Sequence, residues 1–75
     1  MALVKQLQHV RLNRPFVHEE VECTCTVFEG PDGRKYIQLD TYGTKHRQIP
    51  GKKSQSLQLS PEAVKELREI IRDQF

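Results

Sequence analysis

The stretch SQSLQLSPEAVKELREIIRDQF, residues 54–75, decides the fold, because two kinds of secondary structure meet in it at a sharp boundary. In its first part polar and apolar residues alternate, so that Leu57 and Leu59 fall on one side. This period of two is typical of a short strand with one apolar face. We therefore predict a strand over residues 54–59.

The second part of the stretch has the spacing of an amphipathic helix. Apolar residues stand at positions 63, 64, 67, 70 and 71, which lie on one side of a helix with 3.6 residues per turn. Ser60 is a favourable N-cap, and Pro61 suits the first helical position because no partner is needed there for its missing N–H. The pattern predicts a helix over residues 61–74.

Upstream of this stretch, the sequence predicts a β-hairpin. Residues 20–29 and 35–42 both alternate between two kinds of side chain and are rich in residues that favour strands. The connection Gly30-Pro31-Asp32-Gly33 is a turn signal, because proline presets the backbone angle of the second turn position and glycines flank it. We expect two antiparallel strands joined at this turn.

The N-terminal region is less decisive. The apolar residues within 3–12 fit either a strand or a helix, and we favour a strand because 10–12 lacks a helix cap and 13–15 reads as a turn. Residues 42–53 are predicted to form a loop, with a short edge strand around 46–49 as an option. The role of the first 18 residues stays open at this point.

Together these elements predict a single α+β domain over residues 1–75, with an antiparallel sheet of about four strands and one C-terminal helix packed on one face. The helix is expected to cover the apolar side of the sheet. That side should carry Val21, Cys23, Cys25, Val27, Ile37, Leu39, Leu57 and Leu59.

Length and composition limit the class of protein. A chain of 75 residues buries only about 60% of its unfolded surface, so we expect oligomerisation to help stabilise it. The net charge of +2 does not indicate a partner. No secretion signal is evident, and no apolar run approaches the roughly 20 residues of a membrane span. Cys23 and Cys25 are too close in sequence to close a useful loop, so we expect reduced thiols, a cytosolic location and no membrane partner.

The second face of the predicted sheet is the candidate functional surface. It should carry the aromatic residues Phe28, Tyr36 and Tyr42, separated by polar side chains and flanked by lysines and arginines. Aromatic rings between hydrogen-bonding groups, with cations around them, can stack unpaired bases and hold phosphates. The same three rings could instead bind a protein partner or a second copy.

The segment KYIQLDTYGTKHRQIPGKKSQSLQLSPEAVKEL, residues 35–67, resembles the single-stranded-DNA-binding domain of the transcriptional coactivator family called positive cofactor four. With the preceding strand, the resemblance covers roughly two-thirds of the chain. It implies a homodimer that binds single-stranded DNA or RNA on a basic, aromatic sheet surface. The contact residues that it implies are Tyr36, Gln38, Tyr42, Lys45, Arg47, Lys52 and Lys53.

Other kinds of site fit the sequence less well. Cys23 and Cys25 with His18 and His46 could suggest zinc, but structural zinc sites usually separate two cysteines by two to four residues. No nucleophile stands beside a base, and a chain of this size has little room for a catalytic pocket. We also expect Asp40 to pair with a lysine or arginine across the sheet. The sequence therefore favours a non-enzymatic protein without a cofactor; the alternative to nucleic-acid binding is a small interaction protein or accessory subunit.

Overall fold

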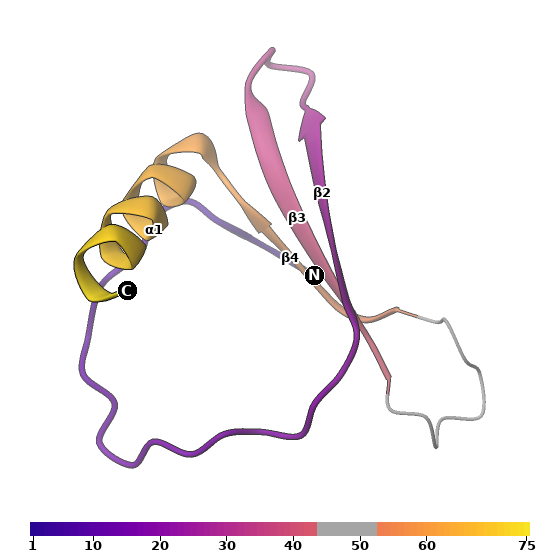
Figure 1. The fold of residues 1–75 in the computed structure, drawn as a ribbon. Helices are drawn as coiled ribbons and strands as arrows, with labels where there is room; N and C mark the ends of the chain where they lie inside the picture. The colour runs from indigo at the N-terminus through magenta and orange to yellow at the C-terminus, as the bar shows by residue number, and fades with distance from the viewer. Residues whose placement is uncertain (44–52) are drawn as a thin grey trace.

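The computed structural model describes residues 1–43 and 53–75 and contains one four-stranded sheet followed by one helix. Its elements are β1 (Ala2–Val4), β2 (Cys23–Glu29), β3 (Lys35–Tyr42), β4 (Lys53–Leu59) and α1 (Pro61–Gln74). The strands lie side by side in the order β1-β4-β3-β2 (Figure 1). The α+β class is confirmed, while the optional edge strand around 46–49 lies outside the described residues.

The hairpin of β2 and β3 forms as predicted. The two strands are antiparallel, from the pair Cys23 and Thr41 to the pair Glu29 and Lys35. Gly33 has a φ of 77°, which glycine adopts without strain. A β-carbon on Gly30 would lie 2.9 Å from the Tyr36 ring, so this turn also needs a glycine at its first position.

The sheet is mixed rather than purely antiparallel. The predicted N-terminal strand is reduced to β1, which runs parallel to β4, with Val4 beside Leu59. Two hydrogen bonds from Ser60 support this position: its N–H donates to the Val4 carbonyl at 3.0 Å, and its hydroxyl donates to the Lys5 carbonyl at 3.0 Å. Residues 5–22, all within the described part of the chain, form neither helix nor strand.

The helix begins and ends where the sequence predicts. Ser60 has an extended backbone and its hydroxyl accepts the Ala63 N–H at 3.1 Å, as an N-cap residue should. The carboxylate of Glu66 accepts the Leu7 N–H at 3.1 Å, which ties the N-terminal segment to the helix. Hydrogen bonds therefore hold both the first turn of α1, through Ser60, and the N-terminal segment beside the helix, through Glu66.

The hydrophobic core is much smaller than predicted. Among the described residues, Leu59 and Ala63 are the only buried apolar side chains, with 4% and 0% of their surface exposed. On the same face Cys23 and Cys25 are exposed, and Val27 is 62% exposed, so the expectation that these residues form the core is wrong. The reason is the course of α1, which contacts β3 and β4 and then extends away from the sheet without covering β2 (Figure 1).

Candidate nucleic-acid interface

The side of the sheet opposite Leu59 carries a continuous set of polar and aromatic side chains, here called the polar sheet face. Strand alternation sends every second residue of β2 and β3 to this side, and the cross-strand register aligns them with residues of β4. An irregularity in the pairing near Tyr42 brings Lys53 to the same side. The members of the polar sheet face are Thr24, Thr26, Phe28, Tyr36, Gln38, Asp40, Tyr42, Lys53, Ser56 and Gln58.

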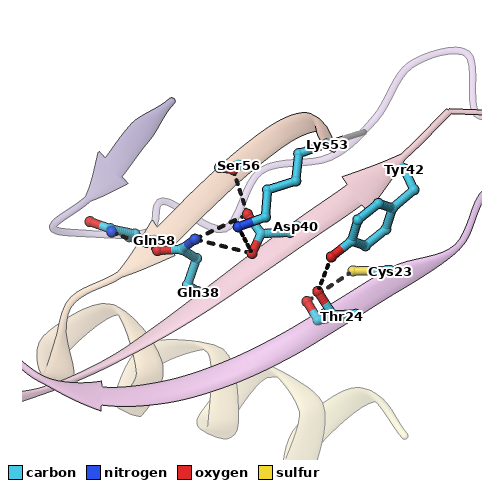
Figure 2. Close-up of polar contacts among 8 residues, drawn as sticks. All are labelled: Cys23, Thr24, Gln38, Asp40, Tyr42, Lys53, Ser56 and Gln58. Carbon is cyan, nitrogen blue, oxygen red and sulfur yellow. Dashed lines mark hydrogen bonds and ion pairs between the residues drawn. The ribbon is translucent and has the colours of Figure 1, made fainter. Parts of the chain in front are cut away.

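The centre of this face is a buried carboxylate, Asp40, of which only 3% is exposed. Ser56 donates its hydroxyl to Asp40, and the Gln38 amide nitrogen donates to both carboxylate oxygens at 3.0 Å. Figure 2 shows that the chain of contacts continues across the sheet, because the Gln58 amide donates to the Gln38 carbonyl oxygen at 2.9 Å. We call Gln38, Asp40, Lys53, Ser56 and Gln58 the Asp40 network.

Lys53 completes the network as the charge partner of Asp40. Its ammonium nitrogen lies 3.4 Å from a carboxylate oxygen, and 55% of the lysine side chain is exposed. The predicted ion pair between Asp40 and a cation across the sheet is thereby confirmed. The hydrogen bond from Ser56, with those from Gln38 and the ion pair with Lys53, holds the pKa of Asp40 below its ordinary value despite burial. At neutral pH the network therefore holds a carboxylate whose charge is balanced.

Aromatic rings stand at both ends of β3. Near the hairpin turn, Phe28 and Tyr36 stack with ring centroids 5.6 Å apart and planes 18° from parallel. The Tyr36 hydroxyl donates to Asp32 at 2.5 Å, and this bond lowers the pKa of Asp32 and raises the pKa of Tyr36. At the other end of the strand, the hydroxyls of Tyr42 and Thr24 share a hydrogen bond of 3.0 Å (Figure 2).

The geometry of the polar sheet face is an alternation of flat rings and hydrogen-bonding groups. Tyr36 and Tyr42 are six residues apart in β3, which corresponds to about 20 Å at roughly 3.3 Å per residue. The Asp40 network fills the space between the rings. Beside it lies a shallow pocket of about 230 Å³, lined by Met1, Ala2, Leu3, Gln38, Ser56 and Gln58.

Four of the seven predicted contact residues are described, and they share this face: Tyr36, Gln38, Tyr42 and Lys53. Lys45, Arg47 and Lys52 lie outside the described residues. The sequence analysis did not identify Ser56 and Gln58 as partners of Asp40 and Gln38. The alternation of polar residues in β4 could have indicated these partners, because they must lie opposite the polar residues of β3 once the two strands pair.

Comparisons with protein-family models, with curated proteins and with solved structures give no match. Among the described residues, no three His, Cys, Asp or Glu side chains gather as a metal site would require. The one described helix is also too short and too polar to cross a membrane. The case for a function rests on the chemistry of the polar sheet face.

Proposed function

We propose that this protein binds single-stranded nucleic acid, DNA or RNA, on the polar sheet face, without catalysis and without a cofactor, and that it acts as a homodimer. The observation that carries the proposal is the pair of aromatic surfaces at the two ends of β3, with hydrogen-bonding side chains between them. Stacking on an aromatic ring is worth about 1–3 kcal/mol per base and tolerates every base. A strand lying along β3 would stack one base near Tyr36 and another near Tyr42.

The charge balance of the face agrees with this role. A free carboxylate in the middle of the face would repel phosphates, but Asp40 is buried and paired with Lys53. More than half of the Lys53 side chain is exposed, so its ammonium can approach a phosphate while it still balances Asp40. Lys45, Arg47 and Lys52, which the resemblance to the positive cofactor four family implies as contacts, would add positive charge next to this position in the sequence.

A protein partner held through Phe28, Tyr36 and Tyr42 is the second candidate. Protein interfaces concentrate their binding energy in a contiguous, fully desolvated centre. Here the stack of Phe28 and Tyr36 is separated from Tyr42 by the Asp40 network. Two separate aromatic surfaces suit successive bases better than the centre of one protein interface, so we favour nucleic acid.

The first test is a titration of the protein into a labelled single-stranded 20-mer and the matching duplex, followed by fluorescence anisotropy. We expect tighter binding to the single strand and a steep loss of affinity between low and physiological salt, because binding releases counterions from the phosphates. A charge-reversed Lys52→Glu/Lys53→Glu variant should not bind. Absence of binding at low salt would reject the proposal and direct attention to a protein partner.

Two variants of Tyr42 separate stacking from hydrogen bonding. Tyr42→Leu removes the ring and should weaken single-strand binding by about 5- to 150-fold, the equivalent of one stacked base. Tyr42→Phe keeps the ring and removes the hydrogen bond to Thr24, so its affinity should stay within about threefold of the parent, since a typical net hydrogen bond contributes little. Equal losses in both variants would argue against base stacking at this position.

A further inference from the structure

Strand β2 forms one edge of the sheet, and no other strand of residues 1–43 and 53–75 pairs with its outer side. It stands last in the strand order, with β3 as its neighbour. Of its seven residues, all but Phe28 are exposed. Within this described strand, residues 23–28 contain no charge and no proline, and the pairing with β3 has no bulge. Natural proteins place charges, prolines or bulges on edge strands to prevent pairing. Because β2 lacks them, its edge is available to another strand.

The register shows which backbone groups are available. The Tyr42 N–H donates to the Glu22 carbonyl at 2.9 Å, and the Gly30 N–H donates to the Arg34 carbonyl at 2.8 Å. In an antiparallel pair, residues that bond to the neighbouring strand alternate with residues that do not. Even-numbered residues of β2 therefore bond to β3. The odd-numbered residues Cys23, Cys25 and Val27 direct their N–H and C=O groups toward the outer edge.

We propose that β2 pairs antiparallel with β2 of a second copy of this chain, with Cys25 opposite Cys25 of the second copy on the two-fold axis. Cys23 then lies opposite Val27 of the second copy. The N–H and C=O groups of the three outward-facing residues form six backbone hydrogen bonds across the interface. The two four-stranded sheets join into one sheet of eight strands.

The side chains of β2 are complementary to themselves in this register. Thr24 lies opposite Thr26 of the second copy, and cross-strand threonine pairs are among the favourable ones in sheets. No two like charges face each other within residues 23–27. In the register centred on Cys25, Glu29 lies beyond the paired segment. A shift of the pairing by two residues would bring the Glu29 carboxylate into that segment, opposite Cys23 of the second copy. The register centred on Cys25 is therefore favoured.

A second copy is the occupant because the chain exposes more surface than a monomer of its size. Its accessible surface is 6959 Å² for a mass of 8.8 kDa, whereas the scaling for folded monomers gives about 4,800 Å². Residues 5–22 are mostly exposed and contribute to this excess, so pairing at β2 would bury only part of it. A permanent partner is also what a chain with so small a core requires, and two-fold pairs of identical chains are the commonest solution.

The pairing has a consequence for the polar sheet face. A two-fold axis perpendicular to a sheet leaves equivalent faces on the same side, so the polar sheet faces of both copies would form one continuous surface. The dimer itself does not depend on nucleic-acid binding. Its tests are therefore made without nucleic acid. A failed dimer test would refute this pairing and the homodimer of the proposed function, while single-strand binding would still be judged by its own titration.

The two cysteines provide a matched test of the register. Cys23→Ser leaves Cys25, and Cys25→Ser leaves Cys23. In the proposed dimer the two Cys25 α-carbons are about 5.5 Å apart, within the range of a disulfide, whereas the two Cys23 residues are offset by four positions, about 13 Å along the strand. With copper phenanthroline and oxygen as the oxidant, which removes two electrons and two protons from each thiol pair, the Cys23→Ser variant should form a covalent dimer. The register would be overturned if both variants cross-linked equally, or if only the Cys25→Ser variant cross-linked.

A proline substitution tests the pairing itself. The Val27 N–H points outward in the monomer, so Val27→Pro removes a bond of the dimer but none to β3, and edge strands tolerate proline at such positions. By sedimentation, the wild type at about 100 μM should be a dimer. Val27→Pro should raise the dimer dissociation constant at least tenfold, while Val27→Thr, which keeps the N–H, should resemble the wild type. A monomeric wild type, or a Val27→Pro variant that dimerises normally with an unchanged circular dichroism spectrum, would overturn the proposal.

Discussion

The two faces of the sheet differ in how they are stabilised. On the polar sheet face, Asp40 is 3% exposed and each of its contacts is a hydrogen bond or an ion pair. On the opposite face, Val27 is 62% exposed, and the buried apolar side chains of the described chain are Leu59 and Ala63. A polar surface is therefore fixed in place while much of the apolar surface is not. Apolar burial should matter most at the β4–α1 connection, and electrostatics should matter most around Asp40.

Leu59→Ala should have the largest effect on stability. Leu59 is one of the two buried apolar residues of the described chain, and truncating a buried leucine usually costs about 2–5 kcal/mol. Leu57 lies on the same face of β4 but is 39% exposed, so Leu57→Ala is the matched control and should cost less than half as much. Urea unfolding at one fixed protein concentration measures both. Similar losses in the two variants would mean that apolar burial is spread evenly along β4.

This contrast also explains what the sequence could predict. The alternation in residues 54–59 and the helical spacing of 61–74 are local signals, and the bounds of α1 and of β3 agree with the prediction. The parallel pairing of β1 with β4 is supported by hydrogen bonds that Ser60 donates from its N–H to the Val4 carbonyl and from its hydroxyl to the Lys5 carbonyl, across a long sequence distance. No local pattern encodes such contacts.

The candidate site was predictable to a similar extent. Alternation placed Phe28, Tyr36 and Tyr42 on one face, as observed. The network around Asp40 was not predicted beyond its ion pair, because it depends on the register that sets Ser56 beside Asp40. The extent of the core was overestimated for another reason. An apolar sheet face predicts that another element packs on it. The sequence pattern does not predict how much of that face the chain's own helix covers.

Asp40→Asn should change how stability depends on pH. The folded state holds the pKa of Asp40 below its ordinary value, so this carboxylate contributes stability above the ordinary pKa of about 4, and the contribution is lost as pH falls through the lower, folded pKa. The wild type should therefore lose melting temperature below about pH 4, where the unfolded carboxylate begins to bind protons. The variant should melt lower at pH 7 and show a flatter acid dependence, as measured by thermal melts from pH 7 to 2.

The control for this prediction is Asp32→Asn. Asp32 is also a carboxylate with a lowered pKa, but it is exposed in the hairpin turn, where it accepts the hydroxyl of Tyr36. Its replacement should alter the acid dependence less, because solvent screens an exposed group. If the two variants have the same pH profile, burial of Asp40 within its network makes no special contribution.

Ser60→Ala should cost about 1 kcal/mol, the usual value for the loss of an N-cap. The Ser60 hydroxyl accepts the Ala63 N–H and donates to the Lys5 carbonyl, so it joins the start of α1 to the end of β1. Ser60→Gly separates the two roles, because glycine is a tolerated cap and should cost only a few tenths of a kcal/mol. If glycine is as damaging as alanine in urea unfolding, the bond to Lys5 carries the effect rather than the cap.

The smallest effect is expected for the ion pair between Arg34 and Glu62, which links the start of β3 to the first turn of α1. Both side chains are about half exposed, at 44% and 50%, so water and salt weaken their attraction. A double-mutant cycle with Arg34→Ala and Glu62→Ala should give a coupling of about 0.2–1 kcal/mol that falls in 1 M NaCl. The pair joins the hairpin to the helix on the sparsely packed side of the molecule. A coupling well above 1 kcal/mol that resists salt would therefore mean that electrostatics holds α1 in place where apolar packing does not.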